Sequence, residues 1–244
     1  MATARAPAAR WHSDRYFYSL MGAAIAAVTF AGFARSFYLA RWFETPRGTP
    51  EITTLLVVHG AVFTCWVALM VVQPLLIASR NRRLHRRLGW FGAATALLMV
   101  VFGNLAAIAA IRVGFIGLGD PHAFYAVPFL AVNSFAVAVF LAIRWRERAE
   151  THKRLILLAN VGLLGAAIAR LPLAAVQAGA PLTFIFLPNL ITLAGILYDW
   201  RTRGRVHNVW IWGGLAMLAS QLILFPLMGS PAWLAFARMM GGLL

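Results

Sequence analysis

The sequence predicts an all-α polytopic membrane helix bundle with seven transmembrane helices. The chain of 244 residues is 61% hydrophobic and only 12% charged, with a mean hydropathy of +0.76, whereas soluble domains are about 25% charged. Seven apolar segments approach or exceed the roughly 20 residues with which a helix crosses a bilayer. None of them shows the alternating pattern of about ten residues that is typical of a membrane β-barrel.

The predicted spans follow one another along the chain with short connections. They cover residues 16–39, 52–79, 88–111, 123–143, 155–176, 182–198 and 209–228. The charged residues inside them are Arg35 in the first span and Arg170 in the fifth, and Pro188-Asn189 interrupts the sixth. Residues 1–15 are a predicted cytoplasmic segment and residues 16–229 the transmembrane domain. Residues 230–244 are too short to cross, so we expect an outer interfacial helix there.

The basic residues predict the orientation. There are 22 of them against 7 acidic residues, for a net charge of +15. An N-terminus in the cytoplasm leaves only Arg41, Arg47, Arg112 and Arg238 outside. Sixteen basic residues then lie on the cytoplasmic side: Arg5, Arg10, Arg15, Arg80, Arg82, Arg83, Arg86, Arg87, Arg144, Arg146, Arg148, Lys153, Arg154, Arg201, Arg203 and Arg205. The positive-inside rule therefore predicts N-in and C-out. Because these runs are short loops, we expect contact with anionic lipids and not with nucleic acid.

A histidine precedes each helix that starts on the cytoplasmic side. These residues are His12, His85, His152 and His207, and the openings HRRL at 85–88 and HKRL at 152–155 nearly repeat. The repeat suggests parallel helical hairpins related by duplication. The histidines could bond loop carbonyls or lipid phosphates at the interface, or they could form a metal or haem cluster. The adjacent arginines would repel a cation and supporting acids are scarce, so we favour the interface and expect no metal site.

Several stretches along most of the chain carry a family resemblance. They are HG at 59–60, FTCW at 63–66, LHRRLGW at 84–90, HKRL at 152–155, AAIARLP at 166–172, YD at 198–199 and RTRGRVH at 201–207. On these stretches the sequence resembles a family of uncharacterised bacterial integral membrane proteins. The resemblance implies a multi-pass protein of the bacterial inner membrane and carries no activity with it. The HRRLG element is also similar to elements of b-type membrane cytochromes and ferric-reductase-like domains.

Every predicted span places one polar side chain at a similar depth in its outer half. At a rise of about 1.5 Å per residue, these side chains lie roughly 6–15 Å below the outer surface. They are Arg35, His59, Asn104, Asn133, Arg170, Asn189 and Gln221. Polar residues inside spans mark functional sites, but they also join helices by hydrogen bonds. We call this set the outer polar layer.

No predicted span contains an acid, although two spans contain an arginine. An intramembrane arginine is costly unless it is paired, hydrated or able to reach the interface. Asp120, Glu51 and Glu44 in outer loops are the candidate partners within the chain. If they do not reach, a carboxylate or phosphate from outside would suit the guanidinium. The lack of intramembrane acids, together with Lys153 being a loop residue, argues against a proton pump and against a retinal protein.

Three functional hypotheses follow. In the first, the protein binds an anionic amphiphile, lipid or cofactor in a polar cavity formed by the outer polar layer. In the second, it is a b-type haem redox protein in which His59 binds iron and Arg35 or Arg170 binds the propionates. In the third, it is a structural or assembly subunit whose polar layer only packs helices. The sequence alone does not decide whether the protein is an enzyme.

Overall fold

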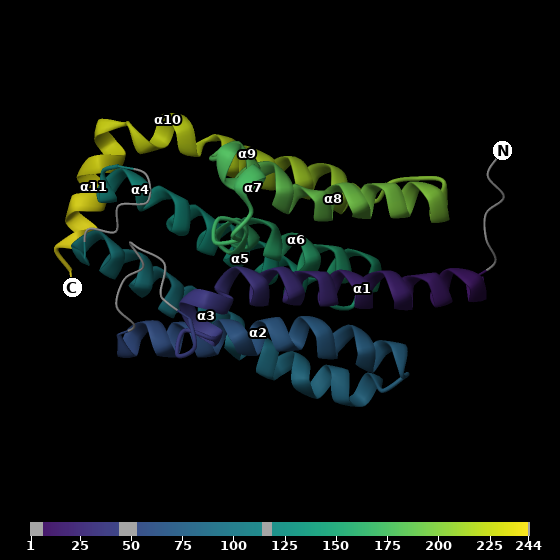
Figure 1. The fold of residues 1–244 in the computed structure, drawn as a ribbon. Coiled ribbons are helices and arrows are strands. Elements are labelled where there is room, and N and C mark those ends of the chain that lie inside the picture. The colour runs from purple at the N-terminus through teal and green to yellow at the C-terminus, as the bar shows by residue number, and fades with distance from the viewer. Residues whose placement is uncertain (1–6, 44–52, 114–118, 244) are drawn as a thin grey trace.

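The computed structural model describes residues 7–43, 53–113 and 119–243, and these are helical with no strand among them. The helices are α1 (Pro7–Phe33), η1 (Ala34–Tyr38), α2 (Thr54–Ala78), α3 (Arg82–Val113), α4 (Pro121–Phe124), α5 (Ala126–Arg144), α6 (Ala149–Ile168), α7 (Ala174–Ala178), α8 (Leu182–Arg203), η2 (Val209–Gly213), α9 (Gly214–Leu222), α10 (Leu224–Met228) and α11 (Pro231–Gly241). The long helices run side by side as an antiparallel bundle (Figure 1). The all-α class that the sequence predicts is therefore confirmed for the described residues.

Six of the described helical segments are long and apolar enough to cross a membrane, whereas the sequence predicts seven spans. The predicted span that does not qualify is 155–176. Its helix α6 starts earlier than predicted, with Glu150, Lys153 and Arg154 in the first two turns, and ends at Ile168. A separate short helix, α7, follows at Ala174–Ala178. The other predicted spans each coincide with one of the six segments.

Helix α6 lies at the centre of the bundle, where it packs against α1, α5, α8, η2 and α9. Its side chains from Leu157 to Val161 are almost completely buried, and they pack with Phe135 of α5, Ile25 of α1 and Trp210 of η2. Its lower hydropathy fits this position, because a central helix contacts protein and not lipid.

Glycines bring the helices close to α6. A Cβ added at Gly32 of α1 would overlap the Ala167 carbonyl of α6. Helix α8 continues through Pro188, although the sequence analysis predicts an interruption of the sixth span there. Proline at 188 removes the hydrogen bond to the Phe184 carbonyl, and Gly165 of α6 lies against that same carbonyl oxygen. A neighbouring helix thus packs against the backbone at this proline, as is usual for prolines in transmembrane helices.

The two ends of the bundle differ in chemistry. The α2–α3 turn, the α5–α6 turn and residues 201–205 lie together with the start of α1, and we call this the basic end. Helices α4 and α11 lie across the opposite end, the α11 end (Figure 1). There Trp233 of α11 is buried against Tyr125 and Phe129, and its indole N–H donates to the His122 carbonyl at 3.0 Å. Helix α11 follows the last predicted span, and the Ser230 side chain caps its N-terminus.

Candidate functional site

Four amides of the outer polar layer bond to one another in two pairs. Asn133 donates to the Asn104 side-chain oxygen at 3.3 Å, which joins α5 to α3. Asn189 donates to the Gln221 side-chain oxygen at 2.6 Å, which joins α8 to α9. The three asparagines also donate to a carbonyl one turn earlier in their own helix. These contacts are those of amides that hold membrane helices together.

His59 and Arg170 form a second part of the layer. The Nδ1 atom of His59 on α2 lies 3.4 Å from the Phe102 carbonyl of α3, and its ring stacks on Phe63 at 4.1 Å. Arg170 follows the end of α6 and is close enough to act electrostatically on His59. Its Nη1 donates to the Ala166 carbonyl at 2.8 Å, and its guanidinium lies 4.9 Å from the centre of the Phe33 ring.

Arg170 has no carboxylate partner in the part of the chain that the structure describes. Asp120, a predicted candidate, instead caps α4 and pairs with His122 at 3.0 Å. Glu44 and Glu51 lie outside the described residues. Arg35 is exposed on η1, at the same end of the bundle. A guanidinium has five N–H donors, so Arg170 keeps donors with which it can bind an anion at the α11 end.

The largest group of charged side chains lies at the other end and was not predicted. We call it the charge cluster: Asp14, Glu150, Lys153, Arg154, Asp199 and Arg203. At its centre Arg154 and Asp199 are both 0% exposed and form a two-pronged ion pair at 2.9 and 2.5 Å. The remaining guanidinium nitrogen of Arg154 donates to the Glu150 carbonyl and carboxylate at 2.6 and 2.7 Å.

Asp14 of α1 is the second centre of the charge cluster. Its carboxylate accepts from Lys153 at 2.6 Å and from the Tyr198 hydroxyl at 2.6 Å. Arg203 Nη2 donates to both of its oxygens at 2.8 Å. Arg203 also donates to Asp199 at 3.1 Å, so one network joins α1, α6 and α8. Three cations face three anions, and the charge cluster is neutral overall.

The hydroxyl of Tyr18 lies beside this network and has no hydrogen-bond partner within the described ranges. The side chain is buried, and Lys153 Nζ lies 4.9 Å from the centre of its ring. Tyr18 and Phe17 pack around Tyr198, whose ring stacks on Phe17 at 3.9 Å. The start of α1 is therefore fixed to the end of α8 by both ionic and aromatic contacts.

The sequence interpretation missed the charge cluster because it placed the span boundaries too far inward. Asp14 and Asp199 then fell outside the spans, and Arg154 and Arg203 were assigned to orientation alone. The available signal was the spacing of Glu150 with Arg154 and of Asp199 with Arg203, since opposite charges four residues apart share a helix face. Asn160 of α6 was missed as well, although it accepts a buried hydrogen bond from Trp66 at 3.0 Å.

The histidines that precede the helices contact backbone groups. His152 Nδ1 lies 2.9 Å from the Ala142 carbonyl, and His207 Nδ1 accepts from the Val209 N–H at 3.2 Å. His85 lies near His152, whereas the side chain of His12 is outside the described part. Within residues 14–43, 53–112 and 119–243, no three His, Cys, Asp or Glu side chains are placed to hold a metal ion.

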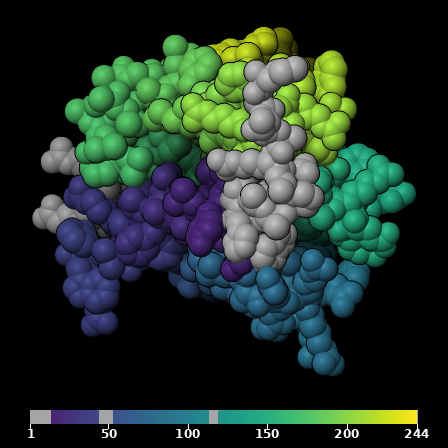
Figure 2. Space-filling view, turned by 90° about the vertical axis from the view of Figure 1, so that its right-hand side faces the viewer, coloured from purple at the N-terminus to yellow at the C-terminus, as the bar shows by residue number. Residues whose placement is uncertain are grey.

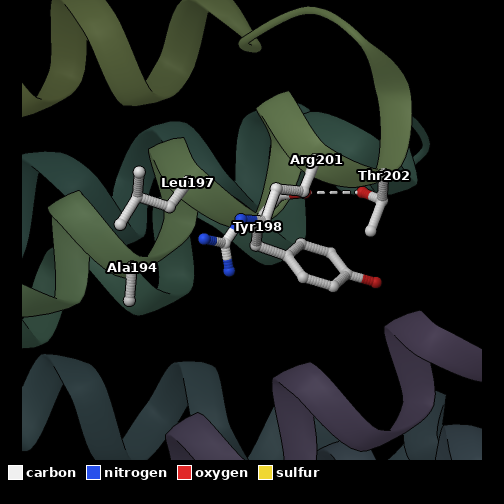
Figure 3. A pocket seen from close by; sticks show the side chains of 5 residues that line it. All are labelled: Ala194, Leu197, Tyr198, Arg201 and Thr202. Carbon is white, nitrogen blue, oxygen red and sulfur yellow. Dashed lines mark hydrogen bonds between the residues drawn. The ribbon is translucent and has the colours of Figure 1, made fainter. Parts of the chain in front are cut away.

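A hollow of about 340 Å³ opens on α8 at the basic end. The described residues that line it are Ala194, Leu197, Tyr198, Arg201 and Thr202 (Figure 3). Viewed from the basic end, the surface between α8 and α1 is recessed (Figure 2). Tyr198 lines this hollow and also contacts the charge cluster, because its hydroxyl donates to Asp14.

No family model, no curated protein and no solved structure matches this chain.

Proposed function

We propose that the protein is a seven-span membrane protein of the bacterial inner membrane that binds an anionic amphiphile near the α11 end. The proposal rests on the surroundings of Arg170. Its guanidinium lies over the Phe33 ring and has no carboxylate partner in the described part of the chain. A guanidinium binds a carboxylate or phosphate through charge-assisted hydrogen bonds, often two at once. The aromatic rings of Phe33 and Phe63 beside Arg170 and His59 would accommodate an apolar chain.

The central position of α6 supports seven spans. It runs antiparallel to both α5 and α8, so the chain crosses the bundle between the α5–α6 turn and α7 (Figure 1). Its charged first turns are neutralised by α1 and α8 in the charge cluster. A helix with such partners can lie inside a membrane protein although its own hydropathy is modest.

The distribution of basic residues supports the orientation. Arginines of the α2–α3 and α5–α6 turns lie at the basic end, together with the start of α1. The positive-inside rule assigns such an end to the cytoplasm. The amphiphile at Arg170 then enters from the outer leaflet.

The experiment that tests the proposal is oleate binding to the purified protein, with oleyl alcohol as the uncharged probe. We expect Arg170→Gln to weaken oleate binding about tenfold, which is the order of one lost charge-assisted hydrogen bond, and to leave oleyl alcohol unchanged. Arg112→Gln is the matched control because Arg112 is an exposed arginine in the last turn of α3, and its effect should stay below about twofold. Equal oleate affinity in both variants contradicts the proposal.

The amide pairs favour a second candidate function, that of a structural or assembly subunit. Asn104 with Asn133, and Asn189 with Gln221, satisfy one another and need no ligand. If this is the function of the whole layer, Arg170→Gln lowers the unfolding temperature while no anion co-purifies with the wild-type protein. Mass spectrometry of the extracted protein separates the two candidates.

The remaining alternative is a b-type haem protein in which His59 would bind the iron. Bonding of one ring nitrogen to a backbone carbonyl is typical of metal-binding histidines, and Nδ1 of His59 faces the Phe102 carbonyl. Arg35 and Arg170 would then hold the propionates. A Soret band in the purified protein that disappears in His59→Ala would support haem binding, and its absence from the wild-type protein would exclude it.

A further inference from the structure

The Arg201 side chain, near the C-terminal end of α8, lies along the wall of the hollow (Figure 3). Its guanidinium folds back along α8 toward Leu197 and Ala194, beside the Tyr198 ring (Figure 3). Helical side chains lean toward the N-terminus of their helix, and in α8 that direction leads toward the middle of the bundle. Arg201 thus carries its charge into the hollow, along the apolar wall.

The charge of Arg201 is not neutralised by its neighbours. The nearby acids are Asp14 and Asp199, and both are occupied by Lys153, Arg154 and Arg203. Across the described ranges Arg201 forms no ion pair. Arg203, two residues further on, differs because it bonds Asp14 and Asp199. The hollow therefore presents one uncompensated cation.

Exposed tryptophans place the hollow at the depth of lipid headgroups. Trp200, next to Arg201, is 60% exposed, and Trp212 and Trp90 at the same end are 69% and 68% exposed. Tryptophan concentrates at the membrane–water interface. A guanidinium at this depth lies among lipid phosphate groups. Ala194 and Leu197 lie further along α8, where they would face the hydrocarbon chains.

We propose that this hollow is a binding site for one anionic phospholipid, whose phosphate contacts Arg201 and whose acyl chain lies along Leu197 and Ala194. The order of polarity along the hollow, from cation to apolar wall, matches that of a phospholipid from headgroup to chain. Its volume of about 340 Å³ suits a headgroup and the first part of a chain. The site lies at the opposite end of the bundle from Arg170 and goes beyond the proposed function.

The test is a native mass spectrometry titration of the detergent-purified protein with dioleoylphosphatidylglycerol and, separately, with dioleoylphosphatidylcholine. We expect the anionic lipid to bind more tightly, and Arg201→Gln to weaken its first binding step about tenfold. Arg205→Gln is the matched control, because Arg205 is exposed in the following loop and does not line the hollow. Its effect should stay below about twofold.

A second variant keeps the test decisive if Arg201→Gln fails to fold. Ala194→Phe fills the apolar part of the hollow and should weaken binding of the anionic lipid without removing a charge. The proposal is overturned if Arg201→Gln and Arg205→Gln bind the anionic lipid with equal affinity, or if the wild-type protein binds the two lipids equally. It is also overturned if an equal concentration of glycerol phosphate displaces the anionic lipid. Arg170→Gln should leave this lipid site intact, so failure here and failure of the oleate test are distinguishable.

Discussion

Arg154 shows how much of this protein depends on one side chain. It is completely buried, and every nitrogen of its guanidinium donates to Asp199 or Glu150. The desolvation cost of such a charge is offset only while its partners stay in place. Stability at the basic end is therefore sensitive to the loss of either member of the pair.

We predict that Arg154→Met destabilises the protein by about 3–5 kcal/mol, because Asp199 is left buried without its main partner. The double variant Arg154→Met/Asp199→Leu should recover most of this loss, since it removes both charges. Thermal unfolding in detergent measures both, with Arg148→Gln as the exposed control. A loss in Arg154→Met no larger than in Arg148→Gln would refute the prediction.

His207 makes the same region sensitive to acid. Burial lowers the pKa of His207, and the nearby charges of Arg154 and Lys153 lower it further, against Asp199 and Glu150, which raise it. Its Nδ1 accepts a hydrogen bond from the Val209 N–H, which requires the unprotonated atom. The folded protein thus binds fewer protons than the unfolded chain between the lowered pKa and the ordinary value of about 6.5.

The contribution of His207 to stability should therefore be fully present above about pH 6.5, which is the pKa in the unfolded chain. It should be lost as the pH falls from there to the lowered pKa of the folded protein. The variant His207→Asn keeps an acceptor for Val209 but does not titrate. We expect its unfolding temperature to change less with pH than that of the wild-type protein, over about pH 5 to 8. Parallel pH profiles of the two proteins would contradict this.

At the scale of elements, close contact between backbones positions α1. The Gly32 backbone lies directly against the Ala167 carbonyl of α6, and Gly22 lies against the Met70 carbonyl of α2. Small residues permit this approach in membrane helices. Because Phe33 is the last residue of α1 and follows Gly32 directly, the same contacts determine where Phe33 meets Arg170.

We predict that Gly32→Ala destabilises the protein by about 1–3 kcal/mol, because its methyl group overlaps a backbone carbonyl that cannot rotate away. Gly89→Ala on α3 is the control, since its Cβ meets open space and alanine favours a helix by about 1 kcal/mol over glycine. Thermal unfolding of the two variants should shift in opposite directions. If both shift alike, the α1–α6 contact is looser than described.

The sequence predicted the existence of the helices better than their ends. Apolar length identified α1, α2, α3, α5 and α8, but α8 continues to Arg203 because Asp199 and Arg203 find partners on α1 and α6. Such contacts between distant segments leave no trace in hydropathy. The sequence likewise predicted a common depth for Asn104 and Asn133 but not the hydrogen bond that joins them.

At the scale of the whole molecule, the start of α1 and helix α11 lie at opposite ends (Figure 1). The proposed seven spans would place these two ends on opposite sides of the membrane. The predicted orientation can be tested by thiol labelling, because Cys65 is the single native cysteine.

In a Cys65→Ala background, we expect Gly242→Cys to react with a membrane-impermeant maleimide in intact cells. Asn81→Cys, in the α2–α3 turn, should react only after the membrane is permeabilised. The reverse pattern would invert the orientation. Labelling of both positions from the same side would exclude seven spans.

The burial of Arg154 has a consequence for biogenesis. Its buried partner Asp199 lies 45 residues later in the chain, so α6 emerges from the ribosome before α8 does. Until α8 follows, the carboxylate available to Arg154 is that of Glu150, one turn earlier on α6. A buried arginine is poorly tolerated by lipid alone. We therefore expect α6 to insert stably only together with α8.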